Sequence, residues 1–133
     1  MCGFVGWLGV GDRNLVDLEK SFSKIKARGP DHSGFEILRS KSGFMSRSKE
    51  SCVLWFHRLA INGLDSTSNQ PMNLSGRNLS NLWLVCNGEI YNHKNLAKKH
   101  KIQLQTESDC EIIIHLYQKL GMNKMLRELD GVF

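Results

Sequence analysis

Several features that mark particular classes of protein are missing from this sequence. No apolar run approaches the roughly 20 residues that a membrane-spanning helix needs. The opening MCGFVGWLGVG lacks the basic start of a signal peptide. The chain also contains no internal repeat and no low-complexity tract. We therefore expect a cytoplasmic protein without a membrane partner.

The cysteines never occur as a CxxC pair, which argues against a zinc ribbon or a thioredoxin-like site. The four cysteines are Cys2, Cys52, Cys86 and Cys110. The last three lie among apolar residues, where a cysteine is usually a buried, reduced thiol. Unpaired thiols indicate a reducing compartment, and we expect no metal ion in this chain.

The charge composition argues against a nucleic-acid-binding protein but does not by itself indicate a function. Lys and Arg number 18 against 13 Asp and Glu, which makes the net charge +5. The basic residues form no dense run and match no nucleic-acid-binding motif, so we expect no nucleic-acid partner. Hydrophobic residues make up 41% and charged residues 23% of the 133 residues, which is typical of one globular domain.

Apolar periodicity predicts strands and helices along the chain. The predicted strands cover 3–9, 34–39, 51–58, 82–86 and the start of a last one at 131–133, with a further short strand within 43–46; the predicted helices cover 15–27, 93–100 and 123–129. Ser108 and Glu111 have the spacing of a capping box, and the helix that follows them stops at Gly121. The 82–86 run, LWLVC, is apolar throughout, which favours a strand covered on both faces. These elements predict layered helices and sheets.

Cys2 is the residue most suited to covalent chemistry. Removal of Met1 would leave it with both a thiol, of pKa about 8.5, and a free α-amine, of pKa about 7.7–8.0. Moving the proton from sulfur to nitrogen then costs only about 1 kcal/mol. Such a residue carries its own base, as N-terminal nucleophiles do.

Partners for such a thiol occur further along the chain. Asn87 and Gly88 could form an oxyanion hole, although an isolated Asn-Gly is usually a tight turn. Arg58 could hold a carboxylate through two hydrogen bonds or be a surface charge. Asp109 could hold an ammonium or complement a helix dipole, and Glu89 could support that ammonium or be solvated. Together these groups fit hydrolysis of the side-chain amide of glutamine.

The motifs that carry these residues occur in a characteristic order. They are MCGFVGWLG, RGPDHSGFE, FHRLAI, LVCNGEIYNH, TESDCEIIIHLY and LDGVF. They resemble, over nearly the whole chain, the N-terminal glutaminase domain of the asparagine synthetase family, which is a class II glutamine amidotransferase. NGEIYNH and RGPD are specific within that class.

The resemblance implies an α+β fold, a four-layer αββα sandwich of the N-terminal-nucleophile hydrolase type. It implies that Cys2 attacks the amide carbon of glutamine, that a γ-glutamyl thioester forms as ammonia leaves, and that water releases glutamate. By matching positions, the catalytic residues are Cys2, Asn87 and Gly88. The matching substrate-binding residues are Arg58 for the α-carboxylate, Glu89 and Asp109 for the α-amine, and Leu59, Ala60, Ile61, Asn62, Asn87 and Gly88. The loop 28–31 is expected to pack near the site as a structural element.

The sequence departs from the family in two respects. Asn62 stands where the family usually has an apolar residue. The match also stops at 133, so we expect 2–133 to be an incomplete, truncated glutaminase domain without its synthetase domain. That domain binds ATP and magnesium in the family and uses ammonia to amidate aspartate to asparagine, whereas the glutaminase domain needs no cofactor.

The expected partners are glutamine and that synthetase domain, and a homo-oligomer stays open. The alternative is a truncated, non-catalytic remnant or interaction module that keeps the fold.

Overall fold

The computed structural model describes residues 2–9, 15–39, 51–74 and 82–133. Its elements are β1 (Gly3–Leu8), α1 (Leu15–Ser23), η2 (Lys26–Arg28), β2 (His32–Arg39), β3 (Ser51–Arg58), η3 (Ser66–Ser68), β4 (Glu89–Ile90), α2 (His93–His100), α3 (Glu111–Leu120), α4 (Met122–Glu128) and β5 (Gly131–Val132). This mixture of helices and antiparallel strands is an α+β arrangement, as predicted. The strand expected within 43–46 lies outside the described residues. None of the described helices is long and apolar enough to cross a membrane.

The first sheet has the strand order β1–β3–β2, and both pairings are antiparallel. Gly3 pairs with His57, and His32 pairs with Arg58. The beginnings of β1 and β2 therefore lie beside the end of β3. This register places Cys2, which precedes β1, next to the residues that follow Arg58.

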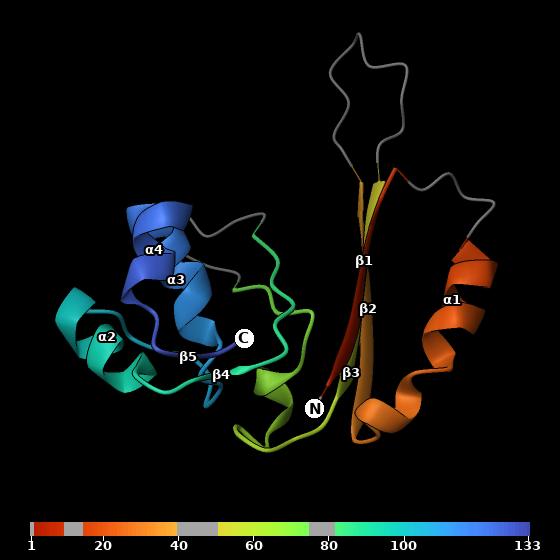
Figure 1. The fold of residues 1–133 in the computed structure, drawn as a ribbon, viewed down its shortest axis with the longest axis horizontal. Coiled ribbons are helices and arrows are strands. Elements are labelled where there is room, and N and C mark those ends of the chain that lie inside the picture. Colours follow the sequence, from red (N-terminus) through yellow and green to blue (C-terminus); the bar gives the residue numbers. More distant parts are fainter. Residues whose placement is uncertain (1, 10–14, 40–50, 75–81) are drawn as a thin grey trace, which may run out of the picture.

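Helix α1 covers one face of this sheet, where Phe22 packs with Val53 and Trp55 (Figure 1). The helix ends at Ser23, so the prediction of a helix to residue 27 is wrong in its last turn. The carbonyl of Phe22 accepts from Ile25 N at 3.1 Å, an i→i+3 bond that tightens the chain into η2. His57 Nε2 contacts the same carbonyl at 3.1 Å.

The helices α2, α3 and α4 pack around the two-stranded sheet of β4 and β5 on the other side of the molecule (Figure 1). Their core consists of Ile90, Leu96, Ala97, Ile112, Leu116 and Met125. The predicted strand start at 131–133 is confirmed by β5, which pairs with β4. Both chain ends lie between the first sheet and these helices (Figure 1).

The LWLVC segment, predicted as a strand over 82–86 with both faces covered, is not a strand in the structure. Only Leu84 makes a bridge, with Met72, and all five residues are half-buried. Side-chain amides form hydrogen bonds with other backbone groups of this segment instead. Asn73 Nδ2 donates to Leu82 O, and the Gln70 amide binds the backbone of Cys86. The prediction is wrong because apolar sequence favours a strand only where a neighbouring backbone runs alongside it.

The capping box predicted for Ser108 and Glu111 is also wrong. Helix α3 begins at Glu111, and the N-cap position, Cys110, makes no side-chain capping bond. The Glu111 carboxylate instead accepts from the backbone of Gln105 at 2.7 Å and of Thr106 at 2.6 Å. A capping box needs its two members on the first turn of the same helix, whereas here Ser108 precedes that turn.

Candidate active site

Cys2 lies at the end of the first sheet, where the backbone of Leu59 contacts its thiol. Leu59 N donates to Cys2 Sγ at 3.2 Å, and Sγ lies 3.6 Å from Leu59 O. Arg28 Nε donates to Cys2 O at 3.2 Å, which fixes the backbone beside the thiol.

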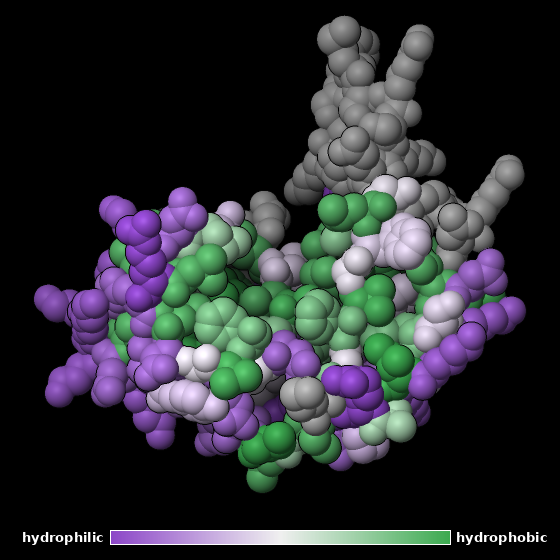
Figure 2. Space-filling view, viewed as in Figure 1, coloured by the Kyte–Doolittle hydropathy of each residue, from purple (hydrophilic) through white to green (hydrophobic). Residues whose placement is uncertain are grey.

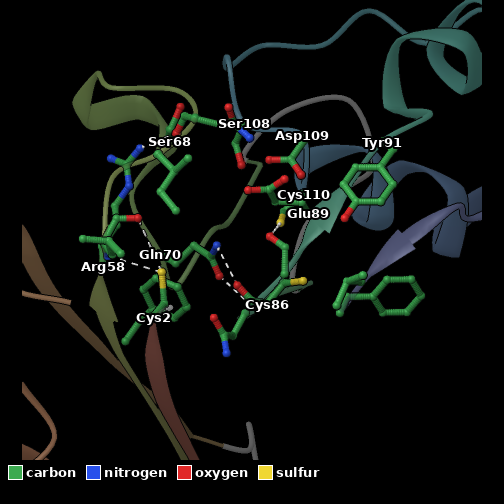
Figure 3. A pocket seen from close by; sticks show the side chains of 18 residues that line it. Cys2, Arg58, Ser68, Gln70, Cys86, Glu89, Tyr91, Ser108, Asp109 and Cys110 are labelled. Carbon is green, nitrogen blue, oxygen red and sulfur yellow. Dashed lines mark hydrogen bonds between the residues drawn. The ribbon is translucent and has the colours of Figure 1, made fainter. Parts of the chain in front are cut away.

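The thiol opens into a pocket of about 350 Å³ between the first sheet and the helices. Its lining includes every residue predicted for the site except Ala60, namely Cys2, Arg58, Leu59, Ile61, Asn62, Asn87, Gly88, Glu89 and Asp109. In Figure 3, Cys2 and Arg58 face Glu89 and Asp109 across the pocket. Figure 2 shows apolar residues gathered along the middle of the molecule, with hydrophilic residues toward its two flanks. The structure thus brings residues from distant parts of the sequence to one pocket.

Asn87 and Gly88 reach the pocket just before β4. A Cβ atom added to Gly88 would lie 2.3 Å from Val132 O and 2.5 Å from Phe133 Cα. Only glycine fits there, because real Cβ atoms do not approach other heavy atoms so closely. The Asn-Gly pair is therefore shaped by its contact with β5.

Asp109 and Glu89 supply the carboxylates of the pocket. Asp109 is 6% exposed, and its Oδ2 accepts from Ile90 N at 2.6 Å. Among the described residues, the other oxygen of Asp109 has no hydrogen-bond partner. Asp109 therefore anchors β4 with one oxygen, and its other oxygen can still accept a hydrogen bond.

Arg58 lines the pocket, but its guanidinium also holds the loop that follows β3. Nη1 donates to Asp65 O at 3.0 Å and to Asn69 Oδ1 at 2.7 Å. Nη2 donates to Asn62 O at 3.0 Å and also to Gly63 O. Both terminal nitrogens are thus engaged by the protein, so the assignment of Arg58 to a substrate carboxylate stays a prediction.

The loop 28–31 packs against the end of β3, as predicted. Asp31 Oδ2 accepts from Ala60 N at 2.7 Å, and Asp31 N donates to Arg58 O at 3.0 Å. A Cβ atom added to Gly29 would lie 2.2 Å from His57 O. The loop therefore supports the strand end that carries the site, and the Ala60 N–H is used for this contact.

Two further cysteines, predicted only as buried thiols, line the pocket. All four described cysteines are free, but only Cys110 is buried, whereas Cys52 and Cys86 are half-buried. A hydrogen bond between Cys86 and Cys110 lowers the pKa of Cys86 and, together with burial, raises the pKa of Cys110. The position of Cys86 next to Asn87 in the sequence could have indicated that it belongs to the site.

Other pocket residues were missed because they carry no sequence signal for this role. They are Phe56, Ser68, Gln70, Tyr91, Ser108, Val132 and Phe133. Gln70 lies in a turn-rich stretch before Pro71, where nothing in the sequence indicates a site residue. Within the described ranges no group of three or more His, Cys, Asp or Glu could hold a metal ion.

Comparison with known proteins identifies the family of this chain. A family model described as a glutamine amidotransferase domain matches residues 1–133. Over 135 aligned residues the chain is 40% identical to the asparagine synthetase (glutamine-hydrolyzing) of Rattus norvegicus and 38% identical to that of Homo sapiens. It is 33% identical to a probable asparagine synthetase (glutamine-hydrolyzing) of Acanthamoeba polyphaga mimivirus. Each match covers 100% of this chain and 22% of the relative, so the chain spans about a fifth of these proteins' length. The chain therefore belongs to the glutamine amidotransferase domain family.

Proposed function

We propose that this domain hydrolyses the side-chain amide of glutamine to glutamate and ammonia, with Cys2 as the nucleophile. The observation that carries the proposal is the convergence of Cys2, Asn87, Gly88 and Asp109 on one pocket. The pocket volume of about 350 Å³ lies in the range of small-molecule sites. The α-ammonium of glutamine would bind Asp109 and Glu89, which places the side-chain amide toward the thiol.

The reaction follows from the groups around Cys2. The α-amine of Cys2 takes the thiol proton, and Sγ attacks the amide carbon as the carbonyl electrons move to oxygen. The Asn87 amide and the Gly88 N–H stabilise this oxyanion. When the carbonyl re-forms, the C–N bond breaks and the amine's proton leaves with ammonia. Water, deprotonated by the same amine, then attacks the thioester and releases glutamate and the thiol.

We further propose that the ammonia serves ATP-dependent amidation of aspartate to asparagine in a synthetase domain of the same protein. The named relatives are glutamine-hydrolysing asparagine synthetases, and this chain matches 22% of their length. ATP and magnesium are assigned to that other domain, and no step here uses them. The same reasoning proposes that 2–133 belongs to a four-layer αββα sandwich. Four free cysteines support a reducing, cytoplasmic location.

The engagement of the Arg58 guanidinium favours a second candidate, a non-catalytic module that keeps the fold. A glutamine carboxylate would have to reach Nε or displace a loop carbonyl from Arg58. Turnover of glutamine therefore separates the two proposals.

The test is glutamate release by the full-length protein and its Cys2→Ala variant, with Cys52→Ala as control because Cys52 is not among the pocket residues. Loss of a nucleophile typically lowers kcat by more than about 10³-fold, so Cys2→Ala should be inactive and Cys52→Ala active. Intact-mass spectrometry should show removal of Met1. Undiminished turnover by Cys2→Ala, or Met1 retained on active protein, would contradict the mechanism.

A further inference from the structure

The stretch 85–88 carries Asn87 and Gly88 but belongs to no strand. Before it, Leu84 exchanges two backbone hydrogen bonds with Met72, at 2.8 and 2.9 Å. After it, β4 pairs with β5. Between these two anchors, no backbone–backbone hydrogen bond among the described residues holds the 85–88 stretch.

Gln70 supplies that contact. Its Oε1 accepts from Cys86 N at 2.6 Å, and its Nε2 donates to Cys86 O at 3.2 Å (Figure 3). One side-chain amide thus binds both polar backbone groups of Cys86, as a neighbouring strand would. Among the described residues, the only other hydrogen bond to the 85–88 backbone joins Cys110 Sγ to Gly88 O at 3.7 Å. Gln70 therefore makes two of the three hydrogen bonds to this backbone among the described residues, in addition to the packing of Gly88 against β5.

The position of Gln70 is itself set by the first sheet. A Cβ atom added to Gly34 would lie 2.3 Å from Gln70 O, so β2 lies directly against the backbone of Gln70. Strand β2 pairs with β3, and β3 pairs with β1, which begins next to Cys2. Gln70 is also only 7% exposed, so its amide does not exchange its partners freely with water. A continuous set of packed elements therefore runs from Cys2 to Asn87 through Gln70.

We propose that Gln70 is a positioning residue that sets the distance between Cys2 Sγ and the oxyanion donors Asn87 and Gly88. The inference rests on the proposed glutaminase function. Oxyanion donors act only when they lie about 2.7–3.1 Å from the developing charge. A misplacement of about 1 Å can lower the rate on the order of 100-fold. Gln70 would thus affect the chemical step while leaving the groups assigned to the α-ammonium in place.

The test compares Gln70→Met with Asn73→Ala in the full-length protein. Methionine retains the bulk of Gln70 but removes both hydrogen bonds to Cys86. Asn73→Ala removes the 2.9 Å bond to Leu82 O, at the other end of the same segment, and Asn73 is not among the residues of the active-site pocket. The variant Gln70→Glu, which retains an acceptor for Cys86 N but no donor for Cys86 O, serves if Gln70→Met folds poorly.

For Gln70→Met and Gln70→Glu we expect kcat per folded molecule to fall by about 10- to 100-fold, while KM for glutamine changes by less than about threefold. Asn73→Ala should lower stability but leave kcat per folded molecule unchanged. The rate at which iodoacetamide alkylates Cys2, which needs no oxyanion hole, should match the wild type in all variants. An equal loss of kcat in Asn73→Ala, or a rise in KM alone, overturns the inference.

Hydrogen exchange of the Cys86, Asn87 and Gly88 amides gives a readout that does not depend on turnover. We expect faster exchange at these amides in Gln70→Met than in the wild type. If the wild-type protein has no glutaminase activity, the proposed function is wrong. Hydrogen exchange then tests only whether Gln70 restrains the backbone of Cys86. Equal protection in the wild type and Gln70→Met overturns the positioning role even if the wild type is active.

Discussion

Asp109 has a structural role through its contact with Ile90 N, and we propose that the same side chain also binds the substrate ammonium. Its Oδ2 anchors Ile90 N, while the carboxylate lines the pocket opposite Cys2. A carboxylate at 6% exposure is expensive to bury unless it is paired. One backbone N–H satisfies part of that need, and the α-ammonium of a bound amino acid would supply the rest. The charge of Asp109 should therefore affect affinity for glutamine more than the rate of the chemical step.

The variant Asp109→Asn tests this separation of tasks. The asparagine oxygen can still accept from Ile90 N, but the negative charge is lost. A hydrogen bond to a charged group contributes about 1.5–3 kcal/mol, so KM for glutamine should rise by about 10- to 100-fold with little change in kcat. Asp109→Ala, which also leaves Ile90 N without its partner, should in addition unfold at a lower temperature. Steady-state kinetics in which Asp109→Asn retains the wild-type KM would remove Asp109 from the substrate site.

At the scale of elements, the start of α3 is held to the preceding loop by Glu111. This side chain is fully buried and accepts from the backbone of Gln105 and Thr106, from Thr106 Oγ1 at 2.7 Å and from His115 Nε2 at 2.9 Å. Burial alone would raise the pKa of Glu111, but the hydrogen bonds from His115, Gln105 and Thr106 outweigh it and lower the pKa. Glu111 thereby fixes the segment that leads to Asp109.

The lowered pKa predicts how stability depends on pH. A carboxylate whose folded pKa lies below its unfolded value of about 4.3 stabilises the protein above that pH. The contribution is lost as pH falls through the lower, folded pKa. Urea unfolding should show Glu111→Gln less stable than wild type by about 1–3 kcal/mol at pH 7, with the gap closing below about pH 4.3. Glu107 is exposed, so Glu107→Gln serves as the control, and its free energy of unfolding should stay near that of the wild type at both pH 3 and pH 7. A gap that is the same at pH 3 and pH 7 would contradict this role.

At the scale of the molecule, the described residues of the first sheet and of the helical part pack into separate cores, and the segment that contains Gln70 connects them. The buried clusters are separate: one lies between α1 and the sheet, one around β4 and the helices, and one joins Met72 and Leu74 to Ile114. The contact of Gly34 with Gln70 O brings the sheet against the segment that serves the site. The close contact at Gly34 therefore restricts how the first sheet packs against the segment that contains Gln70.

A matched pair of glycine substitutions tests this fit. A Cβ atom at Gly34 would lie 2.3 Å from Gln70 O, whereas at Gly6 the nearest atom would be Leu54 Cδ2 at 3.6 Å. Overpacking costs about 1–3 kcal/mol, so Gly34→Ala should lower the free energy of unfolding by that amount and reduce glutaminase activity. Gly6→Ala, on the other edge strand of the same sheet, should change stability by less than about 1 kcal/mol. Equal thermal stability of the two variants would show that the Gly34 contact is not restrictive.

The sequence by itself determined the main elements and the chemical groups of the site. Period-2 and period-3.6 patterns depend on local sequence, so strands at 51–58 and 131–133 and a helix at 93–100 were predicted and are confirmed. Motif order was enough to indicate the family. The assignments of Cys2, Asn87, Gly88, Arg58 and Asp109 to catalysis and binding stay predictions, although all five residues line one pocket.

Only the tertiary structure decided which distant groups meet. Leu59 N at the Cys2 thiol, the Gln70 amide at Cys86, and the Arg58 guanidinium at its own loop are contacts whose partners no local pattern specifies. The same holds for 82–86, whose apolar character predicted a strand, while the available backbone partner reached only Leu84. Hydrogen bonds depend on distance and direction in space, whereas the sequence records only which donors and acceptors exist.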